Sequence, residues 1–358
     1  MKVIIVSPSL DPQRNVSGVS AVTQFILRHC KGVDFRHFTL GRADGERGGW
    51  RRLPALLRRL TAWRTLLRTE RDAVVHYNFP LSRASILRDP VFIAVARCMR
   101  HPLVLHIHGG HYLCRQSIPW PLRWLMQWAF RGQPPVIVLS EQEREVLARY
   151  GVQHIHVLPN AVAEDVAPRL PHAPTGEALT LGYLGRITAD KGMAELLAAC
   201  RLLQGQGIPF RLLMAGREEG DSAFVPAFAE ALGAQFCYAG VVSGREKTAF
   251  LQSLDVFVLP SYFEGLPMSL MESMSVGAVP VVTPVGSVPT VVADGSNGLL
   301  VAAHESDGVA AAIARLHADR SLWHRLSDAA QATIAQQFSP DQYVARLTSI
   351  YDQVSSTR

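Results

Sequence analysis

Short apolar runs recur along the chain, and polar stretches with helical spacing lie between them. Many of these runs are rich in β-branched residues, and Gly, Pro, Ser or Asn lie at their ends, which is typical of buried parallel strands. These runs span residues 2–9, 73–79, 102–108, 135–140, 154–160, 179–185, 210–216, 234–240, 256–261 and 280–285. Ser140 and Glu143 form a capping box that predicts one helix start. The alternation of strands and helices predicts an α/β protein with a doubly wound sheet in each half.

The length of the chain favours two domains. It has 358 residues, 48% of them apolar, which is enough for two substantial cores. Residues 163–177 are rich in Pro and polar residues and lack periodicity, so we expect them to link the domains. We therefore predict domains at 1–165 and 166–338, with a last helix at about 339–358 that begins near Pro340.

Targeting signals are not evident in this sequence. Its first ten residues, MKVIIVSPSL, are too short and too strand-like for a signal peptide. The longest uncharged run, residues 276–293, contains three prolines and does not predict a transmembrane helix. The cysteines are scattered without a C-x-x-C pair, which predicts reduced core residues in a soluble, cytoplasmic protein. They are Cys30, Cys98, Cys114, Cys200 and Cys237.

Positive charge is concentrated in the first half. Lys and Arg outnumber Asp and Glu by 24 to 12 in residues 1–170, whereas 12 face 18 in residues 171–358. Eight arginines lie between Arg47 and Arg71. Apolar residues recur among them at helical spacing, namely Leu53, Leu56, Leu57, Leu60, Trp63 and Leu67.

Two interpretations of this basic helix stay open. A basic amphipathic helix can dock on an anionic membrane surface, or it can be an ordinary helix that packs its apolar face on the sheet. The same choice applies to a second segment, in which Trp120, Trp124 and Trp128 recur every fourth residue. Nucleic acid is a weaker candidate partner, because no nucleic-acid motif accompanies the charge.

Glu264 and Glu272 follow the predicted strand at 256–261, and Pro267 fits the first turn of the next helix. Ligands of open α/β sheets bind at the carboxyl ends of the strands, where Glu264 is expected. A carboxylate there can accept hydrogen bonds from two sugar hydroxyls, and the second carboxylate can hold a ribose. The alternative is an acidic loop followed by a solvated helix face.

A basic loop, LGRITADKG, follows the first predicted strand of the second half. Its Arg186 and Lys191 combine a planar fork with a point charge, and both suit a diphosphate. Gly185 and Gly192 let the backbone approach the ligand, and a helix that begins near Asp190 adds a positive dipole end.

These elements together resemble the retaining nucleotide-sugar transferases of glycosyltransferase family 4. Glu264 and Glu272 match the E-x7-E element, and Arg186 and Lys191 match G-R-x-x-x-x-K-G. DGSNGLLV matches a further family segment, whereas GSVPT has Thr290 where the family has glutamate. The resemblance implies the GT-B fold, an α/β architecture of two Rossmann-like doubly wound domains facing across a cleft. The first domain would bind the acceptor, the second the nucleotide sugar, and the terminal helix would return to the first domain.

The resemblance also implies roles in the first domain. The loop after the first strand, SLDPQRNVSGVSAV, would face the diphosphate with Gly18, because the family's double glycine is reduced here to Ser17 and Gly18. In HIHGGH, His108 matches the histidine that contacts the donor sugar or the developing charge. His106 and His111 also suggest a metal, but a strand alternates faces and no carboxylate is near.

Carried over from the family, the catalytic set is His108, Arg186, Lys191 and Glu264. The donor-binding set adds residues from the glycine loop and the E-x7-E element: Gly18, Gly185, Gly265, Leu266, Pro267 and Glu272. The chain contains no D-x-D sequence, so we expect transfer without a metal or another cofactor. The family retains anomeric configuration, and no carboxylate is an obvious nucleophile for double displacement. We therefore expect front-face substitution.

The sequence thus predicts a cytoplasmic, peripheral-membrane glycosyltransferase. Its partners would be a nucleoside diphosphate sugar, a saccharide acceptor that is lipid-linked, and an anionic membrane surface, with no nucleic acid. The product would be a surface polysaccharide or a glycolipid. An NAD-dependent oxidoreductase is disfavoured because no G-x-G-x-x-G follows a strand. A non-catalytic sugar-binding relative and a nucleotide-sugar epimerase remain as alternatives.

Overall fold

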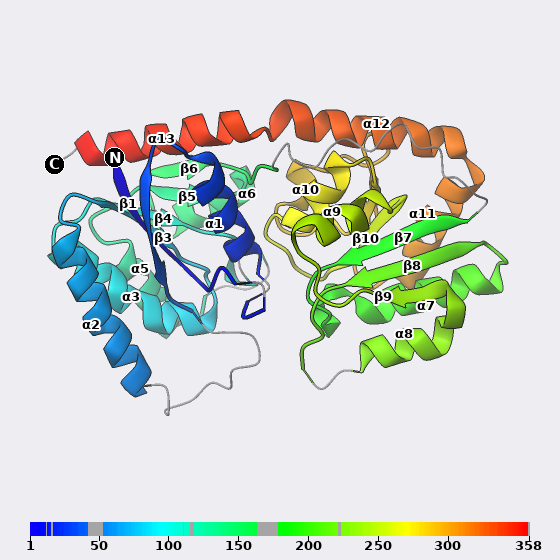
Figure 1. Ribbon diagram of the computed structural model, residues 1–358, viewed down its shortest axis with the longest axis horizontal. Helices are drawn as coiled ribbons and strands as arrows, with labels where there is room; N and C mark the ends of the chain where they lie inside the picture. The colour runs from blue at the N-terminus through cyan, green and yellow to red at the C-terminus, as the bar shows by residue number, and fades with distance from the viewer. Residues whose placement is uncertain are drawn as a thin grey trace. The chain divides into compact units, whose positions relative to one another are not determined.

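The computed structural model describes residues 1–11, 13–15, 17–41, 53–109, 111–114, 118–162, 178–220 and 223–356. The chain forms two compact units (Figure 1). Unit 1 comprises Met1–Asn160 and Pro340–Arg358, and unit 2 comprises Ala161–Ser339. The change of unit after Asn160 lies close to the boundary expected at residue 165. The expected linker, residues 163–177, lies outside the described residues.

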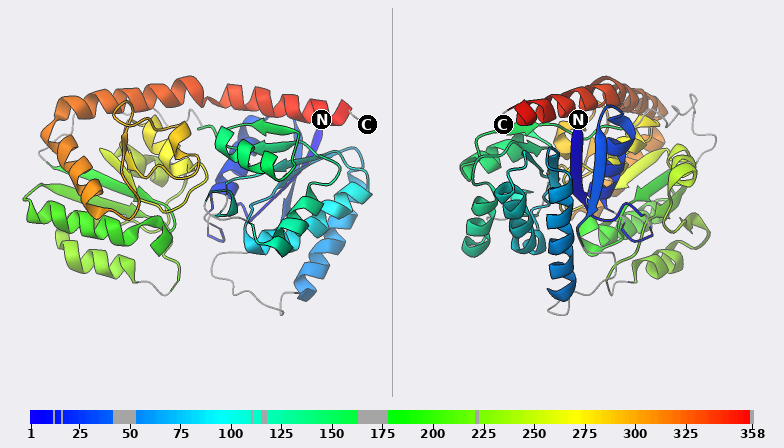
Figure 2. Two further views of the ribbon diagram at one scale, coloured as in Figure 1. Left: turned by 180° about the vertical axis from the view of Figure 1, so that it is seen from behind. Right: turned by 60° about the vertical axis from the view of Figure 1, so that its left-hand side comes forward.

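Unit 1 is built on a parallel sheet of six strands in the order β2-β1-β3-β4-β5-β6. Its strands are β1 (Lys2–Ser7), β2 (Asp34–Thr39), β3 (Val74–Asn78), β4 (Leu103–His106), β5 (Val136–Val138) and β6 (Ile155–Val157). Its helices are α1 (Gly18–His29), α2 (Leu53–Thr69), α3 (Arg83–Cys98), α4 (His111–Cys114), α5 (Trp120–Ala129), α6 (Glu141–Arg149) and α13 (Pro340–Ser356). Within this unit, α2, α3 and α5 cover one face of the sheet, and α1 and α13 cover the other (Figures 1 and 2).

Both faces of the central strands β1, β3, β4 and β5 are buried, which explains why these strands are mostly apolar. On the α2 side, Trp63 is fully buried and its Nε1 donates to the carbonyl oxygen of Phe92 at 3.0 Å. On the other side, Tyr343 of the terminal helix α13 packs edge-on against Phe25 of α1, with ring centroids 5.3 Å apart. The terminal helix therefore belongs to the core of unit 1. At the start of α6, Ser140 accepts from the Glu143 amide, as its capping pattern predicts.

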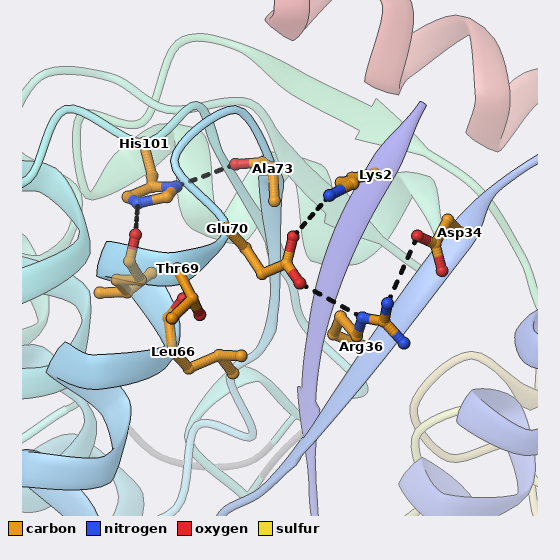
Figure 3. A network of polar contacts seen from close by, with 9 residues as sticks. Lys2, Asp34, Arg36, Leu66, Thr69, Glu70, Ala73 and His101 are labelled. Atoms are coloured by element: carbon orange, nitrogen blue, oxygen red, sulfur yellow. Dashed lines mark hydrogen bonds and ion pairs between the residues drawn. The ribbon is translucent and has the colours of Figure 1, made fainter.

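A polar network ties the end of α2 to the start of the sheet (Figure 3). Glu70 accepts from Lys2 Nζ at 2.9 Å and from Arg36 Nε at 3.3 Å. The hydrogen bond from Lys2 is the main reason that the pKa of Glu70 is lowered. Nearby, the two ring nitrogens of His101 lie 3.0 Å from the carbonyl oxygens of Ala73 and Leu67. These contacts join α2 to β1, β2 and the chain before β3.

Unit 2 repeats the architecture with the strand order β12-β11-β10-β7-β8-β9, also parallel. Its strands are β7 (Leu179–Leu184), β8 (Phe210–Ala215), β9 (Phe236–Tyr238), β10 (Val256–Leu259), β11 (Val279–Val282) and β12 (Leu299–Leu300). Its α-helices are α7 (Met193–Gly205), α8 (Phe224–Leu232), α9 (Gly244–Gln252), α10 (Met268–Ser275), α11 (Ser306–Ala318) and α12 (Arg320–Gln337). Three short 3-10 helices are η2 (Ala189–Lys191), η3 (Gly233–Gln235) and η4 (Val288–Thr290).

Each sheet contains one strand that the apolar pattern does not predict. β2 lies at the edge of its sheet and carries exposed polar side chains, and β12 has only two residues. The basic helix forms as predicted, and its apolar residues Trp63 and Leu67 are fully buried, whereas Leu57 is 58% exposed. Its exposed face carries arginines, including Arg58, Arg64 and Arg68. The structure therefore favours ordinary packing for the apolar face of α2.

The cysteine prediction is only partly right. Cys30 and Cys200 are free and buried, as expected. Cys98, at the end of α3, and Cys237, in the edge strand β9, are free but exposed, so they are not core residues. Cys98 is the last residue of α3, and Cys237 lies in a strand whose side chains are half-buried or exposed, so neither position is in a core. Among the described residues, no helix is long and apolar enough to cross a membrane.

Candidate functional site

The sheet of unit 2 changes its winding direction between β7 and β10. These strands are neighbours, yet the chain leaves β7 toward β8 on one side and leaves β10 toward β11 on the other. Open α/β sheets bind ligands at such a change of winding, at the carboxyl ends of the strands. The loop after β7 carries Arg186 and Lys191, and the loop after β10 carries Glu264.

Lys191 and Glu264 meet at this point. Lys191 Nζ lies 2.6 Å from Glu264 Oε1, and their side chains are 12% and 10% exposed. The same carboxylate oxygen accepts from Ser261 Oγ at 2.7 Å. Two charges so little exposed to water depend on each other, because loss of one partner would leave the other charge uncompensated. The pair is thus a fixed feature of the loop ends.

Two glycines allow the surrounding loops to approach each other. Gly192 adopts φ +73°, and a Cβ there would overlap the carbonyl oxygen of Pro260 at the end of β10. Gly286 adopts φ +57°, and a Cβ there would overlap the Glu264 carbonyl. The amide of Ser287 donates to the Gly265 carbonyl at 3.0 Å. The loops that follow β7, β10 and β11 are therefore in backbone contact, and this contact orients Lys191 and Glu264.

Arg186 lies on the same loop as Lys191 but points elsewhere. Its guanidinium is 46% exposed and lies 3.5 Å from Glu219, in the loop after β8. The Arg186 carbonyl accepts from the buried hydroxyl of Tyr183 at 2.5 Å. Burial, and then the charge of Glu264, raise the pKa of Tyr183 well above its usual value, so this hydroxyl remains a donor. Gly185 packs so closely on Gly216 that a Cβ on Gly216 would overlap the Gly185 carbonyl.

The rest of the E-x7-E element enters α10. Leu266 is buried, Gly265 and Pro267 are half-buried, and Pro267 is the N-cap of the helix. Glu272 lies within α10, where Lys247 of α9 contacts it at 2.7 Å. No described contact joins Glu272 to Glu264. Glu272 thus has a structural partner of its own.

In unit 1, the equivalent change of winding lies between β1 and β3. The predicted donor residue Gly18 is the first residue of α1, and Ser17 caps this helix by accepting from the Ser20 amide at 3.3 Å. A Cβ on Gly18 would meet no atom within 4 Å. Packing within unit 1 therefore does not require glycine at this position.

His108 lies just after β4 and is half-buried. Its Nε2 is 2.5 Å from Oδ1 of Asn78, the last residue of β3. Its ring stacks on that of His106 with centroids 4.0 Å apart. Burial lowers the pKa of His108 to about 3, and nearby His76 adds to this effect. The His108 ring is therefore neutral at ordinary pH.

A metal site does not form among the described residues, which contain no cluster of three or more His, Cys, Asp or Glu side chains with suitable geometry. His106 is fully buried and contacts His76, and the side chain of His111 lies outside the described residues. The DGSNGLLV segment is a structural turn, in which Asn297 accepts from the Ala293 amide and Asp294 accepts from the Leu300 amide. Exposed Thr290 donates to the Ser287 carbonyl at 2.6 Å.

The sequence analysis did not identify three residues that contact the predicted site residues. Ser261 and Lys247 are common polar residues without a motif, and only the sheet order brings them to Glu264 and Glu272. Asn78 is the last residue of β3, VVHYN, and could have been noticed as an amide at the carboxyl end of a strand. The motif residues were found because their spacing is local.

Comparison with known families agrees with this geometry. The profile for "Glycosyl transferases group 1" matches residues 171–333, and that for "Glycosyl transferase 4-like domain" matches residues 2–161. Together they span nearly the whole chain. This protein belongs to the group 1 glycosyltransferases. As a glycosyltransferase of this group it has the GT-B fold, with one six-stranded parallel sheet in each unit.

Among similar sequences, this glycosyltransferase is 25% identical over 315 residues to the alpha-D-kanosaminyltransferase of Streptomyces kanamyceticus. The aligned region covers 81% of this chain and 80% of that protein. It is 26% identical over 183 residues to the capsular polysaccharide biosynthesis glycosyltransferase CapM of Staphylococcus aureus, which covers 51% of this chain and 48% of CapM. Among solved structures, HepE of Anabaena in complex with UDP and glucose superposes with a TM-score of 0.75 at 16% identity, over 99% of this chain and 100% of HepE.

Proposed function

We propose that this glycosyltransferase moves a hexose-type sugar from a nucleoside diphosphate sugar to a saccharide acceptor, with retention of configuration and without a metal. The observation that carries the proposal is the Lys191–Glu264 pair at the change of winding in unit 2. A cation and a hydroxyl-binding carboxylate side by side suit the diphosphate and the sugar of one ligand. The complex of HepE with UDP and glucose supports this ligand class.

In this proposal the diphosphate is held by three groups on one loop. Lys191 carries a compact charge with three N–H donors, of which one faces Glu264. Arg186 is half-exposed and needs only to leave a long 3.5 Å contact with Glu219 to reach a ligand. The first N–H groups of α7, after Gly192, add the positive end of a helix dipole. These groups would neutralise the charge that develops on the leaving diphosphate.

Front-face substitution is consistent with the hydrogen bonds that Glu264 already accepts. Its carboxylate is engaged by Lys191 and Ser261, which suits a group that accepts sugar hydroxyls and not a free nucleophile. The acceptor hydroxyl would attack the anomeric carbon on the side of the leaving group. The bond from that carbon to the phosphate oxygen breaks, the new glycosidic bond forms, and a phosphate oxygen takes the proton of the hydroxyl.

The acceptor is proposed to be lipid-linked and bound by unit 1, at the inner face of the cytoplasmic membrane. Trp120 and Trp124 of α5 are 80% and 62% exposed, one helical turn apart. Arg64 and Arg68 of α2 line a pocket of about 340 Å³ whose apolar walls include Trp128. Exposed indoles and arginines on helices that cover the same face of the sheet suit an anionic lipid surface. The likeness to CapM supports a product of the surface polysaccharide or glycolipid class.

Vesicle binding tests the lipid part of the proposal. The protein should co-sediment with anionic liposomes at physiological salt and not with neutral ones. Replacement of the exposed Trp120 and Trp124 by serine should weaken this binding. A suitable control is Arg346→Gln on α13, an exposed basic residue on the opposite face of the sheet (Figure 1). Absence of binding to anionic vesicles would remove the main support for a lipid-linked acceptor.

Thermal shifts test the donor site. UDP, GDP, ADP and NAD are added in turn in the presence of a chelator. A ligand at about one hundred times its dissociation constant adds about 2.7 kcal/mol, which raises the melting temperature by several degrees. We expect a shift with one nucleoside diphosphate, and its loss in Lys191→Ala. The base that gives the shift then directs the choice of donor sugars for transfer assays.

Two outcomes would contradict the proposal. If no nucleoside diphosphate shifts the melting temperature, a non-catalytic relative becomes the better interpretation, in line with Thr290 in the place of the family's glutamate. If donor turnover yields an epimerised nucleotide sugar without any acceptor, the protein is an epimerase. Wild-type turnover in Lys191→Ala or Glu264→Ala would refute the site assignment.

A further inference from the structure

One face of the sheet in unit 1 carries an unusual row of polar side chains. His76 and Asn78 of β3, together with His106 and His108 at the end of β4, lie on the face that α1 and α13 cover. The intervening residues of both strands belong to the apolar core on the opposite face. His76 and His106 are fully buried, Asn78 is 4% exposed, and only His108 is half-buried. The row therefore runs from the core to the surface at His108.

Asn78 has a fixed orientation in this row. Its Nδ2 lies 2.8 Å from the carbonyl oxygen of Val6, and a second contact at 3.4 Å reaches Thr23 Oγ1. A carbonyl oxygen can only accept, so the nitrogen of the amide has to face Val6. The amide oxygen then faces His108 Nε2 at 2.5 Å, and a flipped amide would oppose two oxygens at the buried Val6 contact.

This orientation assigns the proton on His108. An amide oxygen is an acceptor, so Nε2 of His108 has to donate to it. The environment excludes a second ring proton at ordinary pH, because burial lowers the pKa of His108 to about 3. A neutral imidazole has one donor and one acceptor nitrogen. Nδ1 is therefore the acceptor.

We infer that Asn78 is a positioning residue for His108: it holds the ring as the Nε2–H tautomer, so that Nδ1 offers a lone pair to a hydroxyl group of a bound sugar. The inference rests on the proposed function, because it assumes that a sugar reaches the half-buried face of His108. Nδ1 of His108 thus accepts a hydrogen bond from the sugar hydroxyl. It also explains why the neutral amide of asparagine, which both donates and accepts, stands at the end of β3.

The rings behind His108 restrict its movement. His106 stacks on it at 4.0 Å with an interplanar angle of 32°. His106 Nδ1 contacts His76 Nε2 at 3.1 Å, and His76 Nδ1 contacts the hydroxyl of Tyr351 in α13 at 2.6 Å. Burial keeps the pKa of His76 at about 3, so this stack is uncharged at neutral pH. A neutral, immobile neighbour leaves Asn78 as the group that selects the tautomer.

Nuclear magnetic resonance tests the tautomer directly. Long-range ¹H–¹⁵N spectra of the full chain with ¹⁵N-labelled histidine distinguish a protonated Nδ1 from a protonated Nε2, and His108→Ala assigns the signals. We expect Nε2–H in the wild type and a mixture of tautomers in Asn78→Leu. Asn78→Asp retains an oxygen that faces His108 and should keep the proton on Nε2, although it loses the hydrogen bond that Nδ2 donates to the Val6 carbonyl. Thr23→Val changes the same buried neighbourhood without removing the Val6 or His108 contacts, so it should match the wild type.

Turnover of the nucleotide sugar tests the consequence. Loss of one neutral hydrogen bond in Asn78→Leu or His108→Ala should lower kcat/KM roughly two- to tenfold. Among deoxy analogues of the transferred sugar, one should be used equally well by wild type and His108→Ala. Binding of the nucleoside diphosphate should stay unchanged in all these variants, which separates them from Lys191→Ala.

The results would overturn the inference in distinct ways. Nδ1–H in the wild type, or an unchanged Nε2–H in Asn78→Leu, refutes the role of Asn78 whatever the enzyme does. The expected tautomers with wild-type turnover in His108→Ala refute the contact with the sugar and leave the donor site of unit 2 standing. Loss of nucleoside diphosphate binding in Asn78→Leu would show a general structural defect and would refute a positioning role.

Discussion

Burial of neutral His76 should make unit 1 sensitive to acid. Burial lowers its pKa in the folded protein from the ordinary value of 6.5 to about 3. A histidine whose pKa is depressed by folding contributes full stability above about pH 6.5, and this contribution is lost as the pH falls toward 3. At pH 5 the unfolded chain binds this proton and the folded unit does not. Each pH unit below 6.5 lowers the free energy of unfolding by about 1.36 kcal/mol, so unit 1 loses about 2 kcal/mol of stability by pH 5.

The variant His76→Gln isolates this contribution. Glutamine does not titrate, so the difference between pH 7 and pH 5 in the free energy of opening should shrink by about 2 kcal/mol. Native-state hydrogen exchange in peptides that contain β3 and β4 reports this opening for unit 1 alone. The groups that face His76 are the Tyr351 hydroxyl, the His106 ring and the Asn78 amide. None of them brings a compensating negative charge at these pH values.

A matched control is His154→Gln, which removes an exposed histidine from unit 1. It should leave the pH dependence of opening as in the wild type, although its absolute stability can differ. If His76→Gln keeps the wild-type difference between pH 7 and pH 5, then His76 is not a buried neutral group. The same result would remove the uncharged stack on which the assignment of His108 relies.

Four further predictions concern both units. Glu264→Gln keeps the shape of the side chain but removes its charge, so transfer assays should show a loss of about tenfold or more while nucleoside diphosphate binding persists. Gly192→Ala combines a left-handed backbone with a clash and should lower the melting temperature by more than Gly207→Ala, which has a similar φ of +70° in open space. Tyr351→Phe leaves a buried nitrogen of His76 without its partner and should lower the stability of unit 1 by about 1–3 kcal/mol, measured by hydrogen exchange. Addition of a chelator should leave transfer unchanged.

Each of these predictions has a contrary result. Equal melting temperatures for the two glycine variants would show that the loop after β7 does not press on β10. Wild-type turnover in Glu264→Gln would remove the carboxylate charge from the mechanism. Unchanged exchange in Tyr351→Phe would mean that α13 is held by apolar contacts alone. Loss of transfer on chelation, restored by a divalent ion, would refute metal-independent transfer.

The sequence alone predicted the parts of this protein that depend on local order. Strand and helix alternation, two doubly wound halves, the terminal helix and the loops with Lys191 and Glu264 all follow from patterns a few residues long. Such patterns are informative because a buried parallel strand has to be apolar throughout and a phosphate-binding turn needs glycine and a cation nearby. The family resemblance rested on the same short segments.

Tertiary structure decided which of these parts meet. Lys191 and Glu264 are neighbours only because the sheet order places β7 beside β10, and hydrogen bonding between distant strands leaves no local pattern in the sequence. Packing also decided that α2 turns Trp63 inward, which periodicity cannot distinguish from an outward face. The orientation of Asn78 toward Val6 and His108 depends on three strands at once. A hydrogen bond is selective in distance and angle, so its partners are known only when the fold has brought them together.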